Sequence, residues 1–98
     1  MSLSLKTPKE ISLDIAMRLK TKRLAHNLTQ TGLALRAGMS TSSLKRFEKT
    51  GEISFVSLLN IALVLDCLDE CEHLFAYVAK PDTLFKDAPK IKKRGQIK

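Results

Sequence analysis

A short polar stretch over residues 40–49 concentrates the side chains best suited to binding another molecule. Four hydroxyl residues stand in a row at positions 40–43, and three cations follow at Lys45, Arg46 and Lys49. Hydroxyl groups donate and accept hydrogen bonds, and a guanidinium presents a fork of donors that matches paired acceptors. Ser and Thr are also weak helix formers that favour caps and first turns. The stretch therefore predicts a helix with a small, polar first turn, followed by cations that can reach toward an acceptor-rich partner.

The distribution of charge along the chain agrees with an anionic partner. The chain has 98 residues and a net charge of +7. Residues 1–59 carry ten Lys and Arg against four Asp and Glu, residues 60–79 carry none against four, and residues 80–98 carry seven against two. Such a basic balance suits nucleic acid or an anionic surface. The acidic middle block is expected to lie away from phosphate.

The sequence disfavours several classes of protein. No stretch approaches the roughly 18 apolar residues of a membrane span, and the first residues lack an apolar signal core, which predicts a cytoplasmic protein with no membrane partner. Cys67, Cys71 and His73 match no structural zinc pattern, so free thiols and no metal site are expected. There is no phosphate loop and no nucleophile–base pair, and His26 stands alone. Neither an enzyme nor a cofactor is therefore expected.

The first helix has a strong predicted start. Thr7 and Glu10 have the spacing of a capping box, and Pro8 between them suits the first helical position. The apolar spacing that follows predicts a helix over about residues 8–26. Asn27 is expected to end it in the left-handed conformation that usually requires glycine.

Four further helices complete the predicted domain. Residues 54–65 are apolar almost all round, so this helix is expected to be the central and most buried one. Gly38 and Gly51 are expected to end the second and third helices as left-handed caps. The predicted helices cover residues 30–37, 41–49, 54–65 and 68–78. An arm of residues 1–7 and a basic tail of residues 80–98 flank the predicted domain of residues 8–79.

The second and third predicted helices form a recognisable pair. Two short helices joined by a tight turn that contains glycine make a helix-turn-helix element, whose second helix enters the major groove of DNA. Ala34, four residues before Gly38, is small enough for the helices to cross closely, and Leu44, six residues after it, can lock the second helix against the first.

The chain also resembles the phage-repressor-like (Xre-type) helix-turn-helix domains over about residues 15–75. The motifs that carry the resemblance are LTQ at 28–30, LA at 33–34, AGMS at 37–40, SL at 43–44, FE at 47–48, LL at 58–59, IA at 61–62 and Leu65. The resemblance implies an all-α, five-helix lambda-repressor-like domain with a basic C-terminal tail. It also implies a sequence-specific regulator, a repressor of transcription, that binds double-stranded DNA.

The resemblance assigns base-reading positions to Thr41, Ser42, Lys45 and Arg46. Their spacing agrees, because the two hydroxyls form the first turn and the two cations follow one turn later on an overlapping face. Arg46 could bind guanine through O6 and N7. For the hydroxyls, an ordinary solvated helix start is the alternative.

A second set of residues is predicted to contact phosphate: Gln30, Ser43, Lys49 and Lys22. Gln30 matches the family's phosphate contact at a helix N-terminus. For each lysine, a solvated charge is the alternative. The resemblance further implies a partly buried ion pair between Arg23 and Glu48, whose role is to fix the helix angle rather than to add net stability.

Partners are predicted from size and from the end of the chain. One domain reads too few base pairs for a useful specificity ratio, so a homodimer is expected. The candidate dimer contacts are Leu68, Leu74, Phe75 and Tyr77, with closure of the core as the alternative. The tail resembles that of HipB-like antitoxins, which implies an alternative function: binding a protein toxin of the HipA class and repressing the protein's own operon. A nonspecific DNA-binding arm is the other interpretation of the tail.

Overall fold

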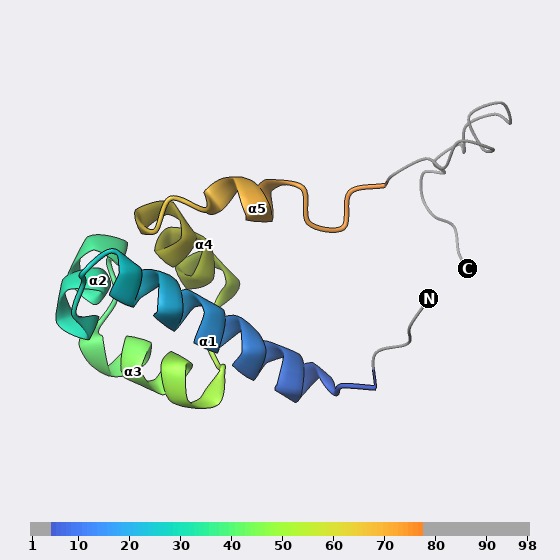
Figure 1. The fold of residues 1–98 in the computed structure, drawn as a ribbon, viewed down its shortest axis with the longest axis horizontal. Helices are drawn as coiled ribbons and strands as arrows, with labels where there is room; N and C mark the ends of the chain where they lie inside the picture. The colour runs from blue at the N-terminus through green and yellow to red at the C-terminus, as the bar shows by residue number, and fades with distance from the viewer. Residues whose placement is uncertain (1–4, 78–98) are drawn as a thin grey trace, which may run out of the picture.

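Helix α1, Pro8–Ala25, begins at the capping box that the sequence predicts. Thr7 Oγ1 accepts a hydrogen bond from the Glu10 amide at 3.1 Å, and the Glu10 carboxylate accepts one from the Thr7 amide at 2.9 Å. Asn27 then has φ 57°, as expected for a left-handed cap residue. The protein is described by a computed structural model that places residues 5–77, so the predicted tail of residues 80–98 lies outside the described part (Figure 1).

Helices α2, Gln30–Ala37, and α3, Thr41–Thr50, form the predicted helix-turn-helix pair. Thr29 and Ser40 cap them, each accepting a hydrogen bond from the amide three residues further on, at 2.9 and 3.0 Å. Gly38 connects the two helices with φ 72°, and Gly51 ends α3 with φ 81°. Both glycines are therefore in the left-handed region predicted for them.

Helices α4, Phe55–Val64, and α5, Leu68–Glu72, complete the described fold. Helix α1 packs against α3, α2 packs against both α3 and α4, and α4 packs against α5. In Figure 1, α3 and α5 lie on opposite sides of the domain, with α1 crossing between them. Residues 5–77 contain five α-helices and no strand, which confirms the all-α, lambda-repressor-like fold.

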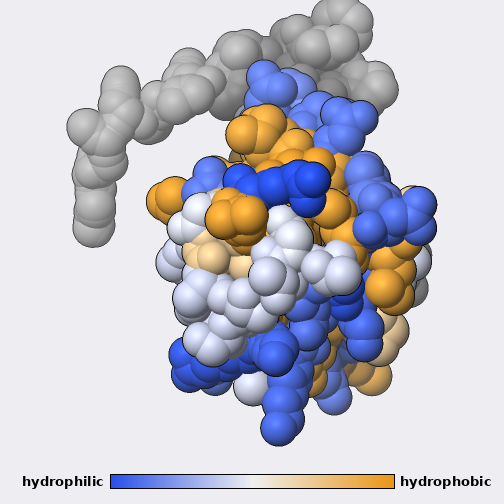
Figure 2. Space-filling view, turned by 90° about the vertical axis from the view of Figure 1, so that its left-hand side faces the viewer, coloured by the Kyte–Doolittle hydropathy of each residue, from blue (hydrophilic) through white to orange (hydrophobic). Residues whose placement is uncertain are grey.

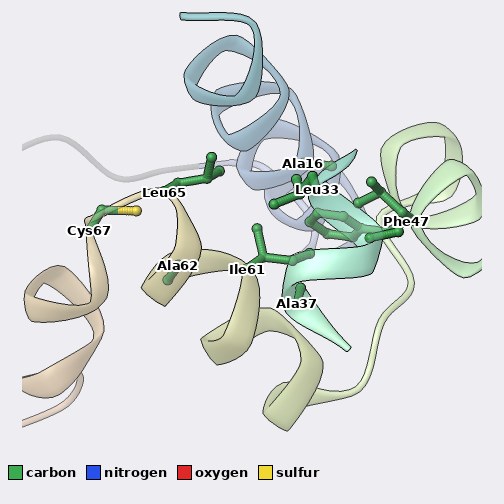
Figure 3. Close-up of a cluster of buried hydrophobic side chains, with 10 residues drawn as sticks. Ala16, Leu33, Ala37, Phe47, Ile61, Ala62, Leu65 and Cys67 are labelled. Atoms are coloured by element: carbon green, nitrogen blue, oxygen red, sulfur yellow. The ribbon is translucent and has the colours of Figure 1, made fainter. Parts of the chain in front are cut away.

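The core is built where α2 meets α1, α3 and α4 (Figure 3). Phe47 of α3, Leu33 of α2 and Ile61 of α4 are almost completely buried there. Ala16 is also fully buried, and its small side chain lets α1 lie close to this cluster. The buried apolar residues are Ala16, Leu33, Ala34, Ala37, Leu44, Phe47, Ile61, Ala62, Leu65 and Cys67.

The prediction that α4 is the most buried helix is wrong. Ile61 and Ala62 are buried, but Phe55, Val56 and Leu63 are 57%, 66% and 60% exposed. The helix packs on α2 with one side only, and α5 is too short to cover the other side. One face of α4 therefore presents large apolar side chains to solvent.

The predicted extent of the fifth helix, residues 68–78, is also wrong. Helix α5 ends at Glu72, and the amides of Leu74 and Ala76 bond to carbonyl groups only three residues back. Phe75 has φ 60°, which no α-helix permits, and its side chain is 98% exposed. In the part of the chain that the structure places, no helix is long and apolar enough to span a bilayer.

Candidate nucleic-acid interface

The outer face of α3 brings together most of the residues predicted to bind DNA. Ser42, Lys45, Arg46 and Lys49 recur at intervals of three and four residues, so they share one side of the helix. All four are exposed. Leu44 and Phe47 on the opposite side are buried in the core. Thr41 lies at the edge of the exposed face and is half-buried.

The first turn of α3 is organised by the hydroxyl of Ser40. Its Oγ accepts the Ser43 amide at 3.0 Å and lies 2.8 Å from Ser43 Oγ and 3.3 Å from Ser42 Oγ. These contacts turn Ser43 toward the cap. Ser42 keeps an exposed position at the head of the helix.

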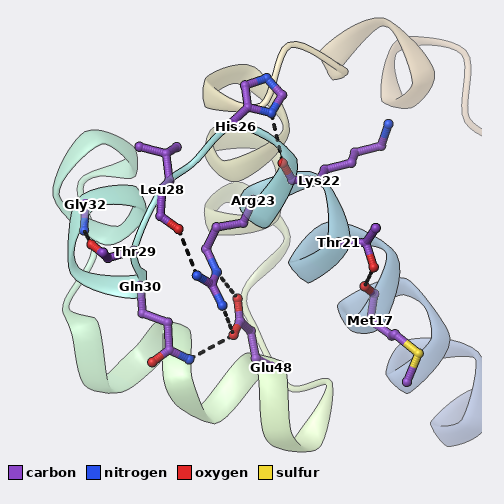
Figure 4. A network of polar contacts seen from close by, with 10 residues as sticks. All are labelled: Met17, Thr21, Lys22, Arg23, His26, Leu28, Thr29, Gln30, Gly32 and Glu48. Carbon is purple, nitrogen blue, oxygen red and sulfur yellow. Dashed lines mark hydrogen bonds and ion pairs between the residues drawn. The ribbon is translucent and has the colours of Figure 1, made fainter.

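A buried polar cluster joins α3 to α1 and α2 (Figure 4). Arg23 Nε lies 2.8 Å from Glu48 Oε2, and Arg23 Nη2 lies 3.2 Å from Glu48 Oε1. Their side chains are 6% and 7% exposed, so the predicted ion pair is present and is more deeply buried than predicted. Arg23 Nη1 also donates to the Leu28 carbonyl at 2.9 Å. The guanidinium and the carboxylate therefore satisfy each other at the junction of the helices.

Gln30 contributes to this cluster in a way that the sequence does not predict. Its Nε2 donates to Glu48 Oε1 at 2.8 Å, so the side chain lies between the start of α2 and the second half of α3 (Figure 4). The first amides of α2 lie beside it, and helix N-termini offer such groups to anions. The position of Gln30 at the start of a helix and its amide group agree with the predicted phosphate contact. Its side-chain nitrogen, however, already donates a hydrogen bond to the Glu48 carboxylate.

Sequence reasoning missed Glu52, which pairs with Arg46. Arg46 Nη2 donates to Glu52 Oε1, and Lys9 Nζ lies 3.9 Å from Glu52 Oε2. The pair forms because Gly51 turns the chain back along the last turn of α3. One signal was available: residues 29–65 of the sequence contain only two carboxylates, Glu48 and Glu52.

A hollow of about 440 Å³ lies beside the Arg46–Glu52 pair. Residues of the turn before α3 and of the segment before α4 line it together with the pair. It opens next to the exposed face of α3. Arg46 thus lies at the border between the outer face of α3 and the loop that leads to α4.

The structure does not bring Lys22 to α3. Lys22 Nζ lies 3.9 Å from Glu70 Oε2 of α5, and Figure 4 shows its side chain extending away from Glu48. The acidic start of α5 thus holds this lysine on another side of the molecule, apart from the other predicted DNA contacts.

The four predicted dimer contacts are all exposed. Leu68, Leu74, Phe75 and Tyr77 are 37%, 44%, 98% and 68% exposed, so they do not close the core of the described chain. Leu68 lines a hollow of about 280 Å³ between α4 and α5, together with Phe55, Leu59, Cys71 and Glu72. We call the exposed and half-buried apolar residues of α4, α5 and the segment after α5 the α4–α5 apolar surface: Phe55, Val56, Leu59, Leu63, Leu68, Cys71, Leu74, Phe75 and Tyr77.

Both cysteines are free thiols near this surface. Cys67 is buried, and this burial is the main reason why the pKa of its thiol is raised above the ordinary value. Within residues 5–77 no group of three or more potential ligands among His, Cys, Asp and Glu could hold a metal ion.

Polar and apolar side chains occupy different regions of the surface. Figure 2 shows the side that carries α2 and the turn into α3. Residues of intermediate hydropathy gather in its centre with hydrophilic residues below them, and hydrophobic residues lie mainly above and to one side.

Comparison with known proteins identifies a helix-turn-helix domain over residues 19–70. The matched range begins in the second half of α1, includes α2, α3 and α4 completely, and ends within α5. It therefore covers the exposed face of α3 and the polar cluster behind it. No curated protein matches the chain.

Proposed function

Because the chain belongs to the Xre-type helix-turn-helix family of DNA-binding transcriptional regulators, we propose that it is a repressor that recognises a specific operator in double-stranded DNA. The observation that carries this proposal is the exposed, basic outer face of α3, which a buried ion pair supports from behind. We place the protein in the cytoplasm, with no catalytic role and no cofactor.

In this proposal α3 lies in the major groove and its outer face reads the bases. Thr41 and Ser42 approach the bases most closely because their side chains are short. Arg46 binds a guanine through O6 and N7, a contact worth about 1–3 kcal/mol of discrimination. Lys45 binds a second base edge or a neighbouring phosphate.

Phosphate contacts flank the bases that are read. Gln30 and the first amides of α2 bind one strand, and Ser43 and Lys49 bind phosphate from α3. The position of Lys22 beside Glu70 supports leaving it out of this set. Contacts of this kind fix the register of the protein on the duplex but carry no sequence information.

The operator is read by a homodimer that forms through the α4–α5 apolar surface. Exposed apolar surfaces of this kind are typical of protein interfaces, and α5 lies on the opposite side of the domain from α3 (Figure 1). A dimer with two-fold symmetry would place its reading helices about one helical turn of DNA apart.

The same surface supports a second candidate function, that of an antitoxin that binds a protein toxin and represses its own operon. The tail, on which the antitoxin interpretation rests, lies outside the described residues. Co-purification of the full-length chain with the product of a neighbouring gene distinguishes this function from that of a repressor with no protein partner.

Selection of bound sequences from random duplex DNA tests the proposal directly. We expect an enriched motif with two related half-sites, and an affinity that falls steeply as salt concentration rises. The absence of a motif, or a salt dependence near zero, would contradict sequence reading by α3.

Two substitutions separate base contacts from phosphate contacts. Arg46→Ala should remove the preference at one position in each half-site, with a loss of about 1–3 kcal/mol on the best sequence. Lys49→Ala should weaken binding to all sequences about equally and reduce the salt slope by about one. Repeating the selection and the salt titration with each variant measures both effects. Equal losses of preference in the two variants would refute the assignment.

A further inference from the structure

The carboxylate of Glu52 lies where it can control Arg46. Oε1 of Glu52 accepts a hydrogen bond from Nη2 of Arg46, and the two side chains are 52% and 67% exposed. An exposed ion pair of this kind contributes little to stability. The pair also determines the direction in which the Arg46 guanidinium points, because Glu52 binds one of its nitrogen atoms.

The side chains of Thr50 and Lys9 fix the position of Glu52 relative to α3. Thr50 Oγ1 donates to the Arg46 carbonyl at 2.7 Å and accepts the Glu52 amide at 3.1 Å. Lys9 Nζ donates to the Thr50 carbonyl at 2.6 Å and lies 3.9 Å from Glu52 Oε2. Glu52 is therefore attached to the last turn of α3 and lies between a cation of α1 and the guanidinium that it contacts.

Glu52 is also the exposed carboxylate nearest to the basic face in sequence. Within residues 29–65 the only other carboxylate is Glu48, whose side chain is 7% exposed and accepts hydrogen bonds from Arg23 and Gln30. A phosphate that approached Arg46 would also approach the negative charge of Glu52. A guanine edge is uncharged and presents two acceptors, so it can engage the guanidinium without that repulsion.

We propose that Glu52 is a positioning residue that sets the sequence specificity of Arg46. It holds the guanidinium at the side of α3 that faces the α3–α4 loop, and it penalises contacts between Arg46 and phosphate more than contacts with bases. Nonspecific binding is thereby weakened relative to operator binding. This inference rests on the proposed function, because it applies to an α3 that reads DNA.

The test compares Glu52→Gln with the unmodified full-length chain. Each protein is titrated with the selected duplex and with a scrambled duplex of the same length and base composition. Asp69→Asn is the matched control, because it removes the same charge from an exposed residue of α5, on the opposite side of the domain from α3.

We expect Glu52→Gln to raise the affinity for the scrambled duplex by roughly threefold to tenfold at low salt and to steepen its salt slope by about one. Discrimination between the duplexes should fall by a similar factor. Asp69→Asn should change binding to both duplexes equally and by less. Unaltered discrimination in Glu52→Gln, or the same loss in Asp69→Asn, would overturn the inference.

A second arm repeats the comparison in an Arg46→Ala background. There Glu52→Gln should behave like Asp69→Asn, because no guanidinium remains to be directed. A loss of discrimination that persists in this background would show that Glu52 acts without Arg46, and the inference would fail. Failure of the proposed function looks different: the unmodified chain would then not distinguish the two duplexes, and the inference would fall with it.

Discussion

Two glutamates of the DNA-binding region have opposite environments. Glu48 is buried and accepts hydrogen bonds from Arg23 and Gln30, so its carboxylate connects three helices. Glu52 is half-exposed and contacts the solvent-facing Arg46. Removing one partner of a buried ion pair leaves an uncompensated charge in the interior, whereas an exposed pair is largely replaced by water. The two residues should therefore differ sharply in their effect on stability.

Glu48→Ala should lower the free energy of unfolding by about 3–5 kcal/mol, because Arg23 would keep its buried charge and lose its carboxylate partner. The matched variant Glu52→Ala should lower it by less than about 1 kcal/mol. Urea denaturation followed by far-ultraviolet circular dichroism measures both values. A Glu48→Ala protein as stable as Glu52→Ala would contradict the structural role of the cluster.

At the scale of elements, the sequence predicts how helices begin better than how they end or what covers them. The starts of α1 to α4 depend on local caps such as Thr7, Ser40 and Ser54, whose partners lie three residues away. Helix α5 ends at Glu72 and turns closed by the Leu74 and Ala76 amides follow it, which apolar spacing that continues past Glu72 does not reveal. The sequence does not predict the exposed side of α4, because an apolar helix can face the core, solvent or another protein, and its pattern is the same in each case.

The candidate site follows the same division. The outer face of α3 and the Arg23–Glu48 pair could be inferred, the first from spacing and the second from a family resemblance. The contacts of Glu52 and Gln30 depend on how separate segments meet, which spacing along one helix does not specify.

The two glycines that end α2 and α3 provide a test at this scale. Gly38 has open space where a Cβ would lie, so Gly38→Ala should cost only the left-handed backbone conformation, about 1–2 kcal/mol. A Cβ on Gly51 would lie 2.5 Å from Ser12 Oγ and 3.0 Å from the Ser12 backbone, so Gly51→Ala should cost distinctly more. Thermal and urea unfolding of both variants measure the difference. Equal losses of stability would mean that α1 does not approach the end of α3 this closely.

For the whole molecule, the main feature is the separation of two surfaces. The basic face of α3 lies on one side of the domain and the α4–α5 apolar surface involves elements on the other (Figure 1). A dimer formed through α4 and α5 would therefore leave both reading helices free. Dimerisation and DNA contact can then be changed independently.

Leu68→Glu should convert the proposed dimer to a monomer, because it would place a charge within the α4–α5 apolar surface. Because Leu68 is only 37% exposed and part of its side chain is buried, urea unfolding of the variant checks that the monomer stays folded. Leu35→Glu is the control, because Leu35 is 79% exposed but lies on α2. Sedimentation equilibrium measures the association, and a Leu68→Glu protein that still dimerises would place the interface elsewhere.

Because the buried and the exposed residues of α3 are different sets, the structure also indicates how new binding preferences can arise. Leu44, Phe47 and Glu48 hold the helix in place, while Ser42, Lys45 and Lys49 point outward and are not part of the core. In the proposed function, exchanging Ser42 and Lys45 retargets the protein to another operator while its scaffold stays intact, whereas Lys49 contacts phosphate and carries no sequence information. Position 46 is the exception: a new side chain there inherits the carboxylate of Glu52, so the two positions are best varied together in any library built to redirect the protein.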